Sequence, residues 1–357
     1  MSTTTLFRDP LVHHLLEPRT GPCITILMPT HRTMPEAQQD AKQLKELAKE
    51  AEARLLENHE KRAVGDILER LHAQVAAYDA SHASEGLALF IAHDTDELVR
   101  LPFPVASRVV AEGSFATREV IRARLGDVDH HVLVLSTKGA HLFVAQSDRI
   151  VGEVRSNGFP IENRHYTTDA LMTSTARGQE NQLREYHHQV DKAVRAAVGE
   201  QGRVVIAGPH EQCAHLLHGA QDRGLYIGEV PGNLEHVNAP EIAAKAWPVA
   251  YEDQKRRQMA DLDLVGRTPD ALRVTALSDV WQLVHEGRGR TLLVERDLRL
   301  PAHREGDGLL SADAEGAEIA DAVDDIIEEQ LRKGGDVRIL PNGTLGQYNG
   351  MALVLRY

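Results

Sequence analysis

Short β-rich runs alternate with segments of helical periodicity along almost the whole chain, and this alternation restricts the fold more than any other feature. The runs, such as residues 130–136 and 203–209, end at glycine, proline or polar residues. The segments between them carry apolar residues at helical spacing, as Leu44, Leu47 and Leu55 do. The sequence therefore predicts an α/β protein in which mixed sheets are flanked by helices.

The length of the chain indicates more than one domain. Its 357 residues are too many for one compact core, because a domain averages roughly 150 residues. Changes in pattern divide the chain into residues 1–125, 126–250 and 251–357. We predict an α/β domain for each of these three segments.

The expected elements follow from the same patterns. In the first domain they are a strand over 23–29, two antiparallel helices between about 35 and 82 with a break at 58–59, and a hairpin over 86–103. In the second they are strands over 130–136, 140–146, 149–155, 203–209 and 225–231, a long polar loop over 156–178, and helices over 180–198 and 211–221. A charged helix over 248–267 leads into the third, with helices over 269–286 and 316–333, a loose acidic loop over 301–315, and strands over 290–295, 336–341 and 351–357.

Charge and cysteine content limit the class of protein. The net charge is −13 and each predicted domain is acidic, which argues against a protein that coats nucleic acid through a basic face. Any contact with RNA must therefore be local or depend on shape. Cys23 and Cys213 are the only cysteines, which fits a reducing compartment and excludes a disulfide framework. We expect a cytoplasmic protein without a signal peptide or a membrane span.

The tripeptide Arg177-Gly178-Gln179 ends the long polar loop, directly before an expected helix. Glycine permits unusual backbone angles at a loop tip, and a glutamine amide both donates and accepts hydrogen bonds. Such a tip can place a polar group and a backbone N–H in the active site of another molecule. The alternative is an ordinary helix N-terminus, because Gly-Gln pairs are common.

Two further polar clusters are candidate contacts to RNA. Thr30-His31-Arg32 follows the first strand, and Lys255-Arg256-Arg257 lies in the charged helix next to Glu252 and Asp253. A polar strand end can contact a ligand or RNA, and a basic run can contact phosphates. The alternative for the basic run is a solvated helix face.

Motifs for metals and cofactors are missing from the sequence. The 19 histidines include no H-E-x-x-H set, and no glycine-rich phosphate loop follows a strand. We therefore expect neither a metal site nor a bound cofactor.

Two separated stretches resemble archaeal and eukaryotic class I release factors. The tripeptide 177–179 and the helix after it are similar to the Gly-Gly-Gln loop and following helix of those factors. Residues 334–357 resemble their last strands and those of the Pelota rescue factor, where a Gly-Gly-x-V strand and a closing G-x-A-x-x-L-R-[YF] strand are typical. Residues 24–51 and Ala246-Trp247-Pro248 are similar to a bacterial group of release-factor-like proteins.

This resemblance implies a three-domain protein that binds the ribosome. The first domain would lie near the decoding centre and the second would reach the peptidyl-transferase centre. The third, an α/β sandwich shared with certain ribosomal RNA-binding proteins, would contact partner factors or the ribosome. The implied partners are ribosomal RNA, tRNA and a translational GTPase, and we expect a monomer in solution. Release factors of this family hydrolyse peptidyl-tRNA with a backbone N–H and a glutamine, which position the attacking water and stabilise the oxyanion. The resemblance assigns this role here to Gly178 and Gln179.

One difference from the family motif bears on activity. Arg177 stands where the triplet has its first glycine, and a side chain in glycine-only geometry costs about 1 kcal/mol or more. Arg177 is instead a candidate contact to RNA phosphate, and Pelota-like relatives act without hydrolysis. We therefore expect a non-hydrolytic factor that occupies the A site of stalled or idle ribosomes, in rescue or hibernation. The alternatives are a peptidyl-tRNA hydrolase that uses Gln179, and a fold diverted to stress signalling or ligand binding.

Overall fold

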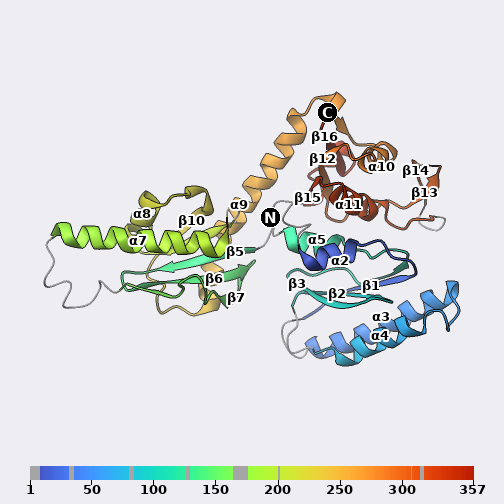
Figure 1. The fold of residues 1–357 in the computed structure, drawn as a ribbon, viewed down its shortest axis with the longest axis horizontal. Coiled ribbons are helices and arrows are strands. Elements are labelled where there is room, and N and C mark those ends of the chain that lie inside the picture. The colour runs from blue at the N-terminus through green and yellow to red at the C-terminus, as the bar shows by residue number, and fades with distance from the viewer. Residues whose placement is uncertain are drawn as a thin grey trace. The chain divides into compact units, whose positions relative to one another are not determined.

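The computed structural model describes residues 9–31, 36–79, 84–125, 129–163, 176–199, 202–306, 308–313 and 317–357. The chain forms two compact units (Figure 1), which we call unit 1, residues 1–125 with 260–357, and unit 2, residues 126–259. The first and last segments of the chain each have their own sheet but pack together in unit 1. The division into three domains stays a prediction.

The N-terminal part of unit 1 is built on an antiparallel sheet with strand order β3-β2-β1-β4. One face is covered by α3 and α4, whose apolar residues, such as Leu44 and Leu71, pack against Ile24 and Ile26 of β1. The other face packs against α2 and α5. The elements are α2 (Pro10–Leu16), β1 (Cys23–Pro29), α3 (Glu36–Asn58), α4 (Gly65–Ala77), β2 (Gly86–Ala92), β3 (Thr95–Leu101), β4 (Arg108–Glu112) and α5 (Arg118–Leu125).

The C-terminal part of unit 1 is a mixed sheet with strand order β11-β16-β12-β15. In it β12 pairs parallel with β15 and antiparallel with β16, so the closing motif of the chain forms an inner strand. Residues of α10 and α11, such as Val280 and Ile326, share one hydrophobic core with Phe90 and Val120 of the N-terminal part. The elements are β11 (Arg273–Val274), α10 (Leu277–His285), β12 (Gly289–Glu295), β13 (Ala302–Glu305), β14 (Gly308–Ser311), α11 (Ala322–Arg332), β15 (Asp336–Leu340) and β16 (Met351–Leu355).

The Gly-Gly pair of the closing motif has a physical reason in unit 1. Gly334 follows α11 with a φ of +69°, in the left-handed region that favours glycine. A side chain at Gly335 would overlap the amide of Gln330, which is completely buried. Gly334 therefore suits the turn from α11 into β15, and Gly335 leaves room for the side chain of Gln330.

Unit 2 contains a mixed sheet with strand order β10-β9-β5-β6-β7, and β8 pairs with β6. Figure 1 shows α7 and α8 on one face, where Tyr186 and Leu216 pack on Leu133 and Ile206. The other face packs against the first part of α9. The elements are β5 (Asp129–Leu135), β6 (Gly139–Gln146), β7 (Arg149–Glu153), β8 (Ile161–Glu162), α7 (Ala176–Val198), β9 (Val204–Gly208), α8 (His210–Gly219), β10 (Tyr226–Pro231) and α9 (Ala239–Arg267).

The predicted α/β architecture is confirmed, and the mixed sheets are those of unit 2 and of the C-terminal part of unit 1. Several local expectations were wrong. The helix expected over 269–286 is only α10, which begins at Leu277 after the short strand β11. Residues 301–315 do not form only a loose loop, because β13 and β14 pair as a hairpin that turns at Gly306, where φ is +60°. The charged helix begins at Ala239, well before 248, and α7 begins at Ala176 and not at Glu180.

Candidate functional site

The tripeptide 177–179 lies within the first turn of α7. The structure therefore places its backbone in a helix and not at the end of a loop. Gly178 is partly exposed, and the side chains of Arg177 and Gln179 lie outside the described residues. The predicted roles of these residues stay predictions.

The helix continues over Gly178 because tertiary packing outweighs local propensity. A glycine inside a helix costs about 1 kcal/mol relative to alanine, which is why the sequence favoured a later start. Tyr186, Val190 and Val194 all face the core of unit 2 and are buried. Their burial stabilises a long helix, and the first turn, with Gly178, continues this helix toward its N-terminus.

A cavity of about 430 Å³ lies beside α7. It is lined by Tyr186 and Gln189 of α7 and by residues 158 and 160–163. The Tyr186 hydroxyl donates a hydrogen bond to the backbone oxygen of Ser136 at 3.1 Å, and burial raises the pKa of this phenol. Tyr186 therefore acts as a fixed hydrogen-bond donor that holds α7 on the sheet.

Thr30 and His31 follow the last residue of β1, and their environments differ. Thr30 is buried, and its hydroxyl donates to the backbone oxygen of Ser84 at 2.9 Å. His31 is exposed, but Asp40 holds it twice, with Oδ2 2.8 Å from its backbone N and Oδ1 2.8 Å from its ring Nδ1. Arg32 lies outside the described residues. Of this predicted cluster, His31 is thus exposed, and Thr30 is buried and bonded within unit 1.

The hydrogen bond to Asp40, which is fully buried, raises the pKa of His31. We expect Asp40→Asn to lower this pKa toward the ordinary histidine value, because the amide cannot stabilise the imidazolium as a carboxylate does. NMR titration of the His31 ring protons measures the shift. Asp66→Asn, which removes the partner of His93 in the same unit, is the control and should leave His31 unchanged. An unaltered His31 titration in Asp40→Asn would contradict the assignment.

The basic run Lys255-Arg256-Arg257 lies on α9 and is paired within its own helix. Lys255 Nζ lies 2.8 Å from Glu252 and 4.5 Å from the ring centre of Tyr251. Arg256 and Arg257 each lie 3.2 Å from Asp253. Exposed pairs of this kind are weak and easily exchanged, so the run remains able to contact phosphate, although two carboxylates accompany its three cations.

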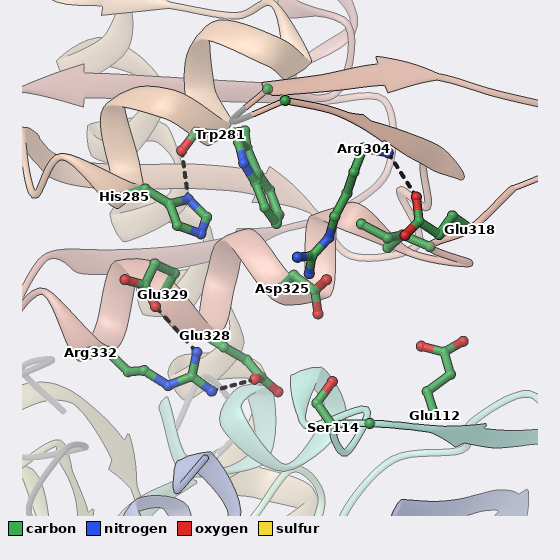
Figure 2. Close-up of a pocket in the computed structure, with 14 residues that line it drawn as sticks. Glu112, Ser114, Trp281, His285, Arg304, Glu318, Asp325, Glu328, Glu329 and Arg332 are labelled. Carbon is green, nitrogen blue, oxygen red and sulfur yellow. Dashed lines mark hydrogen bonds and ion pairs between the residues drawn. The ribbon is translucent and has the colours of Figure 1, made fainter. Parts of the chain in front are cut away.

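A larger cavity of about 770 Å³, which the sequence did not indicate, lies in unit 1 (Figure 2). Glu112 lines it from the end of β4 and Ser114 from the segment after that strand, and Asp325, Glu328 and other residues line it from α11. Figure 2 shows Arg304 extending toward Asp325, while Arg332 contacts Glu328 at 2.9 Å. Its remaining labelled lining residues are Trp281, His285, Glu318 and Glu329.

The electrostatics of this cavity are acidic. Burial, together with the nearby charges of Glu112 and Asp321, raises the pKa of Asp325 to about 6. Burial also raises the pKa of Glu112. The signal in the sequence was the acidic stretch 318–329, but such stretches are ordinarily solvated helix faces, and only the packing shows that this one is enclosed.

Metal and membrane sites are not seen among the described residues. No group of three or more His, Cys, Asp or Glu side chains is placed to hold a metal ion, within the ranges that the structure describes. His187 is buried with a pKa lowered to about 4, chiefly by burial, whereas its neighbour His188 is exposed.

Across the ranges that the structure describes, no helix combines the length and apolar character that a membrane span requires.

Residues 129–288 match the family described as bacterial archaeo-eukaryotic release factor family 3. The match covers unit 2, α9 and the beginning of the C-terminal part of unit 1, slightly less than half of the chain. It supports the resemblance found in the sequence. No curated protein matches the chain.

Solved structures with a similar fold include translation factors. An archaeal translation termination factor, aRF1, is 14% identical with a TM-score of 0.24, over 100% of this chain and 99% of that chain. Dom34 of S. cerevisiae, a translation termination-like factor that interacts with Hbs1, is 13% identical with a TM-score of 0.42, over 76% and 73%. Ribosome-bound archaeal Pelota is 12% identical with a TM-score of 0.44, over 99% and 94%. These likenesses are too distant to bear on activity.

Proposed function

We propose that this bacterial release-factor-like protein is a ribosome-associated translation factor that occupies the A site of stalled or idle ribosomes without efficient hydrolysis of peptidyl-tRNA. The family match over residues 129–288 carries the first part of the proposal, because it covers the unit that contains the tripeptide 177–179. The protein would act in the cytoplasm, with ribosomal RNA as its main partner and a translational GTPase as a further one.

The local structure of α7 supports the second part, the lack of hydrolysis. Arg177 occupies the first turn of a helix, where any L-residue fits, so this backbone does not have the glycine-only geometry expected of the triplet. A hydrolytic tip must place the glutamine and a backbone N–H accurately against the ester carbonyl, and a misplacement of about 1 Å can cost about 100-fold in rate. An arginine in place of a glycine is consistent with binding to RNA and not with catalysis.

Sedimentation of the purified chain with 70S ribosomes tests the proposal. We expect co-sedimentation that weakens with rising salt, because contacts to RNA phosphates release counterions. Ribosomes that carry peptidyl-tRNA should release no peptide above background. Failure to sediment with 70S particles at any salt concentration, including with ribosomes from stressed cells, would contradict the proposal.

Variants of the tripeptide separate binding from hydrolysis. Gln179→Ala should leave both ribosome binding and the background release unchanged, as should Gln189→Ala, the control on an exposed position of the same helix. Release by the wild-type chain that Gln179→Ala abolishes would instead identify a peptidyl-tRNA hydrolase. Arg177→Gly restores the family triplet, and release by this variant alone would show that Arg177 is what prevents hydrolysis.

A further inference from the structure

A charged seam lies between α5 and α11 in unit 1. We define this seam by Thr117 and Arg118 on one side and by Asp321, Asp324 and Glu328 on the other, all of which are buried. The Arg118 guanidinium donates to Asp321 Oδ2 at 2.9 Å, and its backbone N–H donates to Asp324 Oδ1 at 3.0 Å. The Thr117 hydroxyl donates to Glu328 Oε1 at 2.8 Å. These contacts join residues about two hundred positions apart and cap the N-terminus of α5.

The seam contains more negative than positive groups. Arg118 Nη2 pairs with Asp321 and Arg332 Nη2 pairs with Glu328, each at 2.9 Å, whereas Asp324 lies 4.0 Å from Arg118 Nε. Asp324 and Glu328 are four residues apart on α11, so they lie on one face of the helix, where two like charges repel each other. Full ionisation of both buried carboxylates is therefore unfavourable.

Burial is the largest cause that raises the pKa of both Asp324 and Glu328, and neighbouring carboxylates raise each pKa further. A carboxyl with a raised pKa binds its proton more tightly in the packed state than in the open one. The stabilisation by that proton is complete below the ordinary carboxyl pKa and is lost as the pH rises through the raised pKa. Charged groups that face the seam from the packed elements are Arg108 and Glu112 of β4, Glu119 of α5, Arg299 after β12, Arg304 of β13, and Asp325 and Arg332 of α11.

The cavity in Figure 2 gives the seam access to solvent. Glu328 lines this cavity from α11, opposite Ser114 and Glu112 from the segment that leads into α5. Protons can therefore exchange with the buried carboxylates while the two parts of unit 1 stay packed.

We propose that the seam is a proton-linked latch within unit 1. α5 and α11 are held together when at least one of Asp324 and Glu328 is protonated, and they separate more readily when both carboxylates are ionised. The residues of the latch lie outside the family match over 129–288, and the latch does not depend on ribosome binding.

Hydrogen exchange of the full-length chain, measured between about pH 5 and pH 8, tests the latch. The protection factors of amides in α5 and α11 should fall with rising pH, by up to about tenfold per pH unit where one proton is released. Asp324→Asn should remove this slope, because the amide keeps the acceptor for the Arg118 N–H and carries no charge. Amides in α8 of unit 2 should show no such slope.

Two more variants make the result decisive. Glu328→Gln keeps an oxygen for the Thr117 hydroxyl and should also remove the slope, which covers the case in which Asp324→Asn does not fold. Asp279→Asn removes the same charge from an exposed position of α10 in unit 1 and should keep the wild-type slope. A wild-type protection that is constant with pH would overturn the proposal, as would the wild-type slope in Asp324→Asn or Glu328→Gln.

Discussion

Arg118→Met is expected to lower the free energy of unfolding of unit 1 by about 3–5 kcal/mol, because it takes from buried Asp321 its nearest cation and leaves only the more distant Arg108 and Arg299. The arginine side chain is 4% exposed and donates to Asp321 and to the backbone oxygen of Leu298. Methionine fills a similar volume, so the loss of stability comes mainly from the missing charge and hydrogen bonds and not from a cavity. Urea denaturation followed by the fluorescence of Trp281, in a Trp247→Phe background, measures the change in unit 1.

The pH dependence distinguishes the effect of charge from that of packing. We expect the loss in Arg118→Met to be larger at about pH 8 than at about pH 5, because protonation relieves buried carboxylates that have lost their nearest cation. Arg124→Met, on the same helix, removes an arginine that is 43% exposed and lies 3.2 Å from Asp9. It should cost less than about 1 kcal/mol. An equally small loss in Arg118→Met, identical at both pH values, would show that the seam is not under electrostatic strain.

Gly208→Ala is expected to destabilise unit 2 by about 3 kcal/mol, because overpacking at a rigid backbone position forces the sheet to shift. Gly208 ends β9, and an added Cβ would overlap the backbone oxygen of Leu135 on the neighbouring strand β5. The Gly208 carbonyl also accepts a hydrogen bond from the Gly232 N–H at 3.1 Å, which fixes the backbone of Gly208 further. Urea denaturation followed by Trp247 fluorescence, in a Trp281→Phe background, measures the effect.

Gly219→Ala is the matched control for this prediction. Gly219 is the last residue of α8, and a Cβ there meets no atom within 4 Å. The same substitution should leave the stability unchanged or raise it by up to about 1 kcal/mol, because alanine favours the helix. Similar losses at positions 208 and 219 would mean that the close approach of β9 to β5 is not what excludes a side chain at Gly208.

Local pattern was sufficient for most of the elements. The strand over 23–29, the break between two helices at Asn58 and the hairpin of β2 and β3 all appear as expected. Each depends on residues close in sequence, where side-chain periodicity reports which face is buried. The start of α7 was missed because the low helix propensity of Gly178 is a local signal that packing further along the helix overrides.

The sequence by itself determined the α/β class, most of the helices and strands and the closing strand β16, because these follow from periodicity and turn residues within short windows. Only the tertiary structure decided that Arg118 meets Asp321 and Asp324, that Thr117 meets Glu328, and that the acidic stretch of α11 is enclosed. These contacts join segments that are distant in the sequence. The burial of the carboxylates, which raises their pKa values, depends on how those segments pack, and no local sequence pattern indicates it.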